Sequence, residues 1–576
     1  MKKASMVLHN GSIRSLDIQG RKTEYEAMAI SEGKIFSLGA FDEMKDLIGE
    51  DTELMDLKGR SLLPGLSDSH LHAAMTTEMV FDFDLRGVDF SPEMKRADYI
   101  KAYQEILQKY LGAHPGPEAD RVLRGTGWNP ILFVSDPEGQ PKASDLDAVC
   151  DDVPIMLRSF DHHYLWVNSK ALELAGITKD TPTPRNGVVE RDKEGNPTGI
   201  FQETTAMDLL IRNLPGADYT VEEYKEGIKF YQKEFGNKYG ETLIFDAYCS
   251  ENAVQAYTEL EEAGELNLRV RTSFYADPSL PASQFDDILA KKDRYTASDG
   301  FAIQTVKFFI DGSGLSFYLR EPFEKEWLHA IGLKEGYKGY SQWTQDELNE
   351  IFLKLDTAGF QIHLHCMADG AVGMALDAFE FVAKHNDIKK NRHTITHLML
   401  AGKDDFRRMS EMGIIAAIQP MWAMADSLSE QSGAAMLGSE RIHETYLFGS
   451  MKEAGCRLTC GTDFPVTIPP SPFLGIQTGV TREISPPHPE YETYKGLRLG
   501  AEDEKLTVDD LLDGYSISSA YQCFLENVTG SLETGKSADF VVLDRDIALV
   551  PEDEIGEIKV AHTYFKGREV YRGDEV

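Results

Sequence analysis

Eight short apolar segments, separated by stretches with helical periodicity, most constrain the fold of this 576-residue chain. The helical stretches include DELNEIFLKLDTAG and DDFRRMSEMG. The apolar segments are SLLPGLSDSH, ETLIFDA, LNLRVRTSFYAD, FAIQTVKFFIDG, FQIHLHCM, HTITHLML, GIIAAIQP and RLTCGTDF. Strands that alternate with helices are typical of an α/β protein with a parallel sheet. Eight such units predict a (β/α)8 TIM-like barrel.

The two ends of the chain have a different pattern. Short β-like segments with Gly and Asn turns fill residues 1–62, and ADFVVLDRD and AHTYFKGREVY repeat the pattern within residues 526–576. We expect these two parts to form one small β-sandwich domain. The expected barrel begins at residues 63–79 and resumes at 226–525. Residues 80–225 exceed a normal connection between barrel strands, so they predict an inserted domain after barrel strand 1.

Charge and cysteine content exclude several classes of partner. Lys and Arg number 59 against 95 Asp and Glu, and the net charge of −36 repels phosphate backbones and anionic lipid. We therefore expect neither nucleic acid nor membrane partners. The 6 cysteines form no CxxC pair, which is typical of free thiols in a reducing compartment. The sequence has no signal-peptide or membrane-spanning run, so we expect a cytoplasmic protein.

Polar residues lie at the ends of several expected strands. His70 and His72 end the first strand, where residues two apart point to the same face. His365 ends the fifth strand, His397 ends the sixth, and Asp463 ends the eighth. A core or loop role would explain any one of them, but the C-terminal ends of barrel strands meet at one rim. Imidazole and carboxylate ligands together predict a site for zinc or a similar divalent ion.

Lys307, in the expected strand TVKFFIDG, is unusual for its surroundings. A lysine flanked by Val306 and Phe308 is costly to bury as an isolated ammonium. One interpretation is a structural lysine that is ion-paired or reaches solvent. The other is an amine of lowered pKa that reacts with carbon dioxide, since the resulting carbamate is an anion that can bridge two metal ions. The strand alone leaves both interpretations open.

Several motifs together resemble the amidohydrolase superfamily, specifically amidohydrolase family 3, the YtcJ-like branch. These motifs are PGLSDSHLH, VKFFIDG, HLHCMADGA, RHTITH, GTDFPV and the C-terminal GSLETGKSADFVVLDRD. Within the insertion, GTGWNP, DHHYLWVNSKALELAGI and RDKEGNPTGIFQE resemble further features of the branch. The resemblance extends from residue 5 to residue 571.

The resemblance implies a role for each strand-end residue. The implied ligands are His70, His72 and Asp463 for one buried metal ion, His365 and His397 for a second ion, and Lys307, as a carbamate, for the bridge between them. Two departures from the branch affect substrate and metal preference. CMAD stands where A-x-G-D is usual, and Thr396 stands where the branch often has Glu.

The implied reaction is hydrolysis of an amide-type C–N bond of a small molecule, in an N-acyl, N-formyl or lactam group, by metal-activated hydroxide. Asp463 would act as the acid–base shuttle. The insertion is expected to face the barrel mouth, where Trp128, His163 and Gln419 are candidates for substrate contact. Packing, capping or loop hydrogen bonding would equally explain these three. His363, a layer below the rim, is expected to be a core or supporting residue.

Other functions remain open at this point. A deaminase or an esterase would use the same metal site, although deaminases of this superfamily commonly use one metal ion and no carbamate. A non-catalytic binding protein would be marked by missing ligands, and none of the six is missing. We expect zinc, as two ions bridged by carbamylated Lys307, with a one-metal form left open. A homodimer is also left open.

Overall fold

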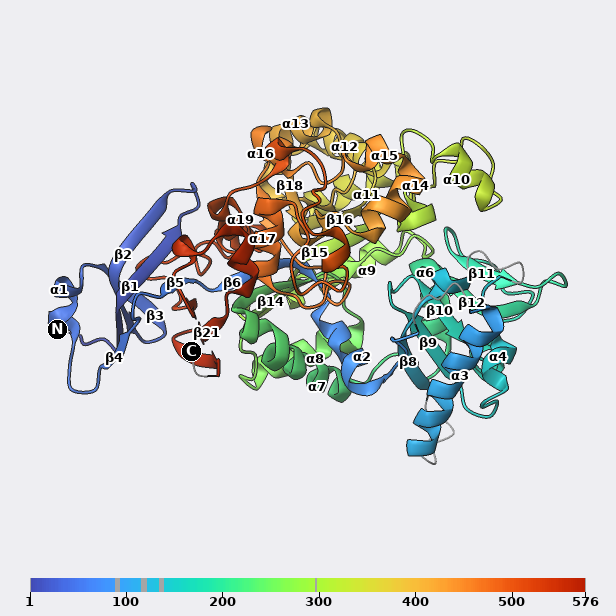
Figure 1. Ribbon diagram of the computed structural model, residues 1–576, viewed down its shortest axis with the longest axis horizontal. Coiled ribbons are helices and arrows are strands. Elements are labelled where there is room, and N and C mark those ends of the chain that lie inside the picture. The colour runs from blue at the N-terminus through green and yellow to red at the C-terminus, as the bar shows by residue number, and fades with distance from the viewer. Residues whose placement is uncertain (1, 89–93, 115–121, 134–138, 296–297, 575–576) are drawn as a thin grey trace.

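A parallel sheet of eight strands forms the centre of the computed structural model, which describes residues 2–88, 94–114, 122–133, 139–295 and 298–574. Figure 1 shows it between two outlying parts of the chain. Along the sheet the strands follow in chain order: β6 (Leu66–Leu71), β13 (Glu241–Asp246), β14 (Arg269–Tyr275), β15 (Phe301–Phe309), β16 (Gln361–Cys366), β17 (Thr394–His397), β18 (Ile415–Ile418) and β19 (Leu458–Cys460). Each coincides with a predicted segment, and the expected barrel is confirmed.

The first and last barrel strands are tied together just beyond their paired residues. The backbone N–H of Asp463 donates to the carbonyl of His70 (2.8 Å), and that of His72 donates to the carbonyl of Phe464 (2.7 Å). Gly461 permits this approach, because a Cβ there would lie 2.7 Å from the backbone nitrogen of His70. The end of β19 is therefore held against the end of β6.

Amphipathic helices cover the outside of the barrel, as α11 (Gln345–Thr357) illustrates. Its capping box joins Thr344 and Glu347, each backbone N–H meeting the other side chain. Its buried face includes Leu348, Phe352 and Leu355, which follow helical spacing. The helices α8 (Glu251–Glu262), α12 (Asp369–Ala383) and α13 (Lys403–Met412) also follow barrel strands. Within the described ranges, no helix is both long and apolar enough to cross a membrane.

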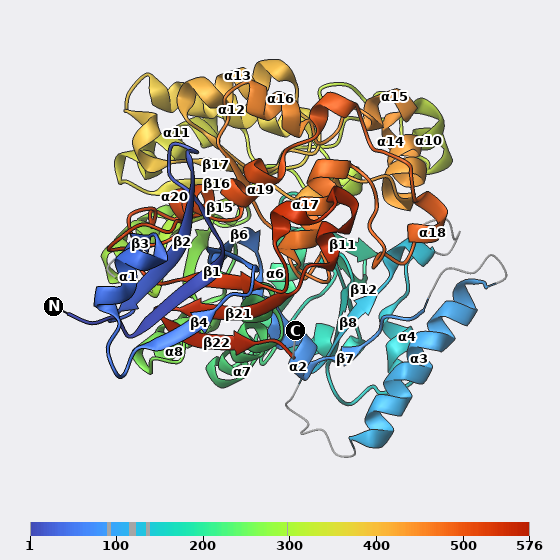
Figure 2. The ribbon, with the colours of Figure 1, turned by 60° about the vertical axis from the view of Figure 1, so that its left-hand side comes forward.

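Both ends of the chain contribute to a second eight-stranded sheet, seen in front in Figure 2. Its strands are β1 (Met6–Leu16), β2 (Lys22–Ser31), β3 (Lys34–Gly39), β4 (Glu53–Asp56), β5 (Ser61–Pro64), β20 (Phe540–Leu543), β21 (Val560–Phe565) and β22 (Arg568–Arg572). The sequence SLLPGLSDSH was expected to be one barrel strand, but its first half is β5, which pairs antiparallel with β20. Gly65 separates the two halves.

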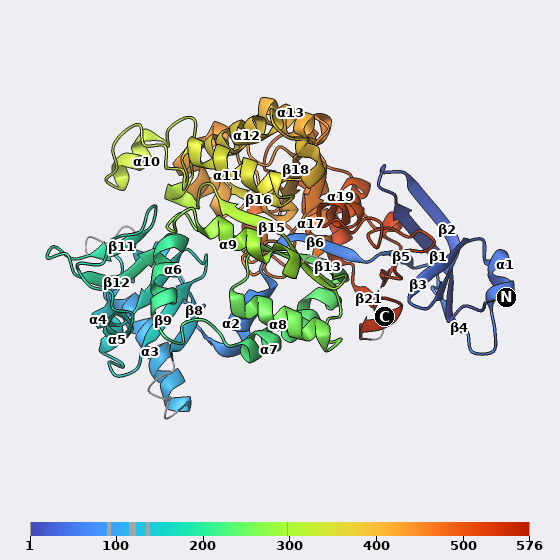
Figure 3. The ribbon, with the colours of Figure 1, turned by 180° about the vertical axis from the view of Figure 1, so that it is seen from behind.

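The insertion contains a third sheet, which lies beside the barrel in Figures 1 and 3. Its strands are β7 (Phe83–Asp84), β8 (Leu123–Trp128), β9 (Ile155–Ser159), β10 (Tyr164–Val167), β11 (Val188–Arg191) and β12 (Pro197–Gln202), and α6 (Glu203–Asn213) follows them. The expected boundary at residue 225 falls inside α7 (Val221–Tyr231). That helix packs on the barrel, because Ile228 and Tyr231 share a core with Ile244 of β13.

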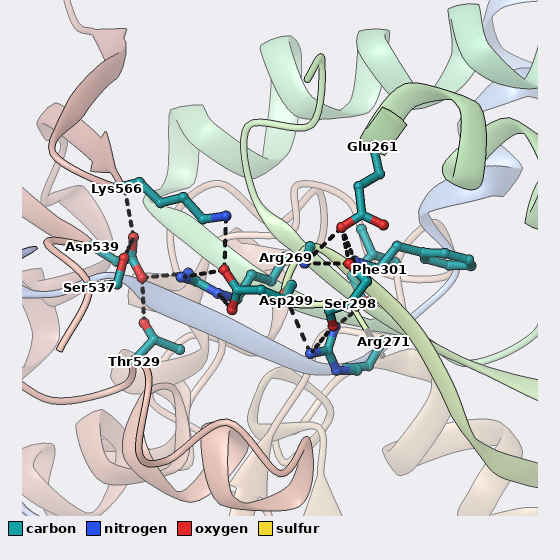
Figure 4. A network of polar contacts seen from close by, with 12 residues as sticks. Glu261, Arg269, Arg271, Ser298, Asp299, Phe301, Thr529, Ser537, Asp539 and Lys566 are labelled. Carbon is teal, nitrogen blue, oxygen red and sulfur yellow. Dashed lines mark hydrogen bonds and ion pairs between the residues drawn. The ribbon is translucent and has the colours of Figure 1, made fainter. Parts of the chain in front are cut away.

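A buried ion pair joins the barrel to the small β domain (Figure 4). Arg269 of β14 donates from Nη1 to Oδ2 of Asp539 at 2.5 Å, and the two side chains are 1% and 0% exposed. Asp539 also accepts hydrogen bonds from the Thr529 hydroxyl (2.8 Å) and from the backbone N–H of Lys566 (2.8 Å). Asp299 contacts the other side of the Arg269 guanidinium at 3.0 Å. Removing Asp539 would leave a buried guanidinium partly unpaired.

We expect Asp539→Ala to destabilise the protein by about 3 kcal/mol, because removing one partner of a buried pair exposes the desolvation cost of the other. The measurement is the shift of the urea unfolding midpoint. The control is Glu492→Ala, which removes an exposed partner of Lys495 and should leave the midpoint unchanged. An unchanged midpoint for Asp539→Ala would show that Asp299 alone satisfies Arg269.

Candidate metal centre

The structure brings the predicted strand-end ligands together at one rim of the barrel. One ligand atom from each of His70, His397 and Asp463 lies within 4.8 Å of the other two. Oδ1 of Asp463 lies 3.4 Å from Nε2 of His70 and 3.2 Å from Nε2 of His72. The rings of His365 and His397 are 4.4 Å apart. Four imidazoles and one carboxylate therefore lie together at one rim, and three of these residues could share one ion.

Electrostatics favour the cation-binding protonation states of His70, His365, His397 and Asp463. Burial lowers the pKa of His70 and of His365 well below the ordinary value, and neighbouring cationic groups add to the shift. Burial also lowers the pKa of His397 to about 4. Burial opposes ionisation of Asp463, but the imidazoles of His70 and His72 hold the pKa of Asp463 well below its usual range. Neutral imidazoles and an ionised carboxylate are metal-binding forms.

Unpaired buried atoms at the rim fit a cation. Oδ1 of Asp463, Nε2 of His365, Nδ1 of His72 and Nζ of Lys307 are all buried and have no hydrogen-bond partner among the described residues. Such atoms are costly to leave unpaired and call for an explanation at each position. Oδ1 of Asp463 and Nε2 of His365 are potential ligand atoms for a divalent ion, so the donor set fits a metal.

Lys307 lies on β15 with its side chain fully buried at 0% exposure. Its Nζ is 5.0 Å from the centre of the Phe309 ring. Burial lowers the pKa of Lys307 to about 7, although the Asp463 carboxylate opposes the shift. A substantial share of the amine is thus unprotonated at neutral pH. An amine in that state is a nucleophile.

Polar residues behind the rim orient two of the imidazoles. Nδ1 of His70 lies 2.7 Å from Nε2 of His363, which stacks on Phe245 one layer below. Nδ1 of His397 lies 3.0 Å from Oε1 of Gln419. Because each Nδ1 is engaged, the Nε2 atom of each ring is left to face the site. His363 thus lies in the supporting layer that the sequence predicts for it.

The backbone is strained at two of the ligands. His397 has a φ of 75° and Asp463 has a φ of 56°, a left-handed region that non-glycine residues rarely adopt. Each such residue costs about 1–3 kcal/mol and persists only where its surroundings hold it in place. Strain of this kind gathers at functional sites.

A cavity of about 1400 Å³ opens above the ligands. The barrel contributes the five candidate ligands and Lys307 to its lining, with Tyr248 and Tyr275 just beyond β13 and at the end of β14. The insertion contributes Arg158, His163 and Asp208. A concave site of this size accommodates a small molecule.

The sequence model of a family described as the amidohydrolase family matches residues 53–571. The chain belongs to the amidohydrolase family. This amidohydrolase contains all six residues that the resemblance assigned to the metal site.

Related proteins align with this amidohydrolase along nearly its whole length. Protein LONG AFTER FAR-RED 3 of Arabidopsis thaliana is 28% identical over 99% of this chain and 92% of its own. N-substituted formamide deformylase of Arthrobacter pascens is 25% identical over 98% and 97%. YtcJ of Bacillus subtilis (strain 168) is 26% identical over 98% and 99%. The crystal structure of an uncharacterized metal-dependent hydrolase from Pyrococcus horikoshii OT3 has the same fold, with a TM-score of 0.70, 24% identity, and coverage of 95% and 99%.

The three predicted substrate contacts have different positions in this amidohydrolase. His163 lines the cavity. Trp128 is fully buried in the core of the insertion, where its indole N–H donates to the carbonyl of Leu157 at 3.1 Å, so the packing alternative describes it. Gln419 is fully buried behind His397 and does not line the cavity. Its side chain hydrogen-bonds to His397, so the structure favours the hydrogen-bonding alternative over substrate contact.

Supporting residues were missed from the sequence. The Asp311 carboxylate accepts backbone N–H groups of Met367 (2.9 Å) and Ala368 (3.1 Å), which fixes the chain just after His365. Glu203 contacts His163 at 3.0 Å. Both residues lie at the ends of motifs that carry the family resemblance, Asp311 in VKFFID and Glu203 in RDKEGNPTGIFQE. Neither motif indicates which residue the carboxylate contacts in the folded protein.

We expect Gln419→Leu to weaken divalent metal binding by about 10–100-fold, because a ligand imidazole loses the bond that sets its tautomer and orientation. The measurement is a competition titration against a chromophoric chelator. The matched control is Gln477→Leu, at a buried glutamine that does not line the cavity and accepts the N–H of Gly556. Equal affinities in the two variants would contradict the orienting role.

Proposed function

We propose that this protein is a metal-dependent hydrolase that cleaves an amide-type C–N bond of a small molecule, in an N-acyl, N-formyl or lactam group. The observation that carries the proposal is the convergence of four imidazoles, one ionised carboxylate and one buried lysine at the floor of a single cavity. The relative named N-substituted formamide deformylase spans almost the whole chain and supports the N-formyl class.

The proposed metal is zinc, which takes imidazole and carboxylate ligands. When bound, such an ion lowers the pKa of water toward about 7 and polarises a carbonyl group. The proposed ligands are His70, His72 and Asp463 for one ion, His365 and His397 for the other, and carbamylated Lys307 for both. Bound ions would satisfy Oδ1 of Asp463 and Nε2 of His365, which have no hydrogen-bond partner among the described residues, and carbamylation would remove the unpaired ammonium of Lys307.

Carbamylation changes the sign of the charge at Lys307. The neutral amine adds to carbon dioxide, the C–N bond forms, and one proton leaves to solvent. Unmodified Lys307 as an ammonium would repel both ions at close range in a site of low dielectric constant. A carbamate on Lys307 would instead be an anion able to hold both ions.

Asp463 is the proposed proton carrier. Its carboxylate is ionised and buried at the point where the histidines converge, so it accepts the proton of the attacking water. The same carboxyl group then passes the proton to the leaving nitrogen. This transfer is needed because an amide nitrogen leaves as an amine rather than as an anion.

A panel of small molecules tests the proposal. The zinc-loaded protein is assayed against N-acyl, N-formyl, lactam and ester compounds and against aminopurines and other amines that a deaminase would accept. We expect turnover of at least one amide-type class. Turnover of esters or amines alone would contradict the proposed bond and favour one of the other two reactions.

We expect Asp463→Asn to lower kcat by about 10²–10⁴-fold while KM changes little, because Asn offers an oxygen to a metal but accepts no proton. The assay uses whichever panel compound the protein hydrolyses, with metal content measured in parallel. Asp426→Asn is the control, since its buried carboxylate does not line the cavity. An unchanged kcat with the metal retained would assign the proton transfer to another group.

We expect Lys307→Ala to lose most of its bound metal and activity, because the bridge between the ions is gone. Short carboxylic acids such as acetate should restore part of both by entering the vacated space. Metal is measured by elemental analysis, with Lys536→Ala in the small β domain as the control. Full metal content and activity in Lys307→Ala would contradict the carbamate.

A further inference from the structure

His163 enters the cavity from the insertion, as part of an ion pair. Its Nδ1 lies 3.0 Å from Oε2 of Glu203, and their side chains are 20% and 12% exposed. The backbone N–H of Glu203 also donates to the carbonyl of His163 at 2.9 Å. Among the described residues, Nε2 of His163 has no hydrogen-bond partner, and the residue lines the same cavity as the metal-site residues. The imidazole is therefore held at one nitrogen and open at the other.

Glu203 is itself held from the barrel side. Its Oε1 accepts a hydrogen bond from the Ser316 hydroxyl at 2.7 Å. A Cβ on Gly312 would lie 3.0 Å from Oε2 of Glu203, so glycine there leaves room for the carboxylate. Gly312 and Ser316 follow β15, the strand of Lys307. Glu203 thus contacts both the insertion and a barrel loop.

The backbone around the pair is strained. Glu203 has a φ of 65° and His162 has a φ of 61°, both in the left-handed region. Asp161 stabilises the turn by accepting the Ser159 hydroxyl (2.5 Å) and the backbone N–H of His163 (3.2 Å). A simple connecting loop would not need two non-glycine residues in the left-handed region. The strain therefore indicates that the position of the His163 side chain matters for function.

We propose that His163 is a further catalytic residue, which donates a hydrogen bond from Nε2 to the substrate oxygen that becomes negative as water adds to the carbonyl, and that Glu203 is its positioning residue. This inference rests on the proposed hydrolysis. The insertion would then contribute a catalytic side chain as well as a wall of the cavity.

The charges favour a donor at this position. Burial opposes the imidazolium form, but the Glu203 carboxylate, 3.0 Å away, raises the pKa of His163. A cationic donor forms a stronger hydrogen bond to an oxyanion than a neutral donor does. Preorganised donors of this kind act in the transition state, where the oxygen carries its charge. They therefore change kcat more than KM.

Kinetics of three variants provide the first measurement, with formanilide as the probe and zinc-loaded protein. We expect His163→Asn to lower kcat by about 10²-fold, and Glu203→Gln and Ser316→Ala by about 10-fold and 3-fold, each with KM changed less than kcat. The matched control is Glu190→Gln, the same substitution at a carboxylate on β11 of the insertion, outside the cavity. It should leave kcat unchanged. If Glu203→Gln fails to fold, Ser316→Ala still tests the positioning role, because it removes a hydrogen bond to Glu203.

Binding of methylphosphonate provides a second measurement that needs no turnover. This tetrahedral anion presents oxygens like the one that His163 would contact. Calorimetry on the zinc-loaded proteins should give an affinity about 10-fold weaker for His163→Asn and for Glu203→Gln than for the wild type, at equal zinc content. Equal affinity in all proteins would overturn the inference and leave the proposed hydrolysis intact. Weakened binding without turnover of any amide probe would contradict the proposed reaction and, with it, the catalytic role of His163, and would leave His163 as an anion-binding residue of the cavity.

Discussion

The tie between the first and last barrel strands is the constraint on which the site depends. The buried Asp68 carboxylate accepts the backbone N–H (2.9 Å) and the hydroxyl (2.6 Å) of Thr462, a residue 394 positions away. It also accepts the backbone N–H of His70 at 2.9 Å. These bonds hold Asp463 in its left-handed conformation beside the imidazoles of β6. The contacts that close the barrel between β6 and β19 thus also place Asp463 beside His70 and His72.

The rim that these bonds hold in place also contains buried polar atoms without hydrogen-bond partners in the described part of the chain. Four buried polar atoms lack hydrogen-bond partners among the described residues, and each such atom costs about 1–3 kcal/mol. Two ligand residues add backbone strain. The surrounding barrel supplies the stability that maintains these unfavourable features. A cation bound there would offset part of their cost, so ligand binding and fold stability are expected to be linked.

The sequence predicts the barrel, and the position of the candidate ligands at one rim, because both depend on local rules. Strand period places His70 and His72 on one face, and parallel strands bring their C-terminal ends to one rim. Contacts between distant segments were not predictable. Gln419 reaches His397 and Glu203 reaches His163 only after folding, and motif spacing carries no such information. The sequence places the end of the inserted domain at residue 225, inside α7. Helical periodicity alone does not show that this helix packs on the barrel.

The most direct test of the account is anomalous diffraction at the zinc edge from crystals of the zinc-loaded protein. We expect two zinc peaks, one beside His70, His72 and Asp463 and the other beside His365 and His397. Electron density for a carbamate on Lys307 should lie between them. A single peak next to an unmodified lysine would contradict the two-metal site. Absence of any peak at the rim would contradict the account as a whole.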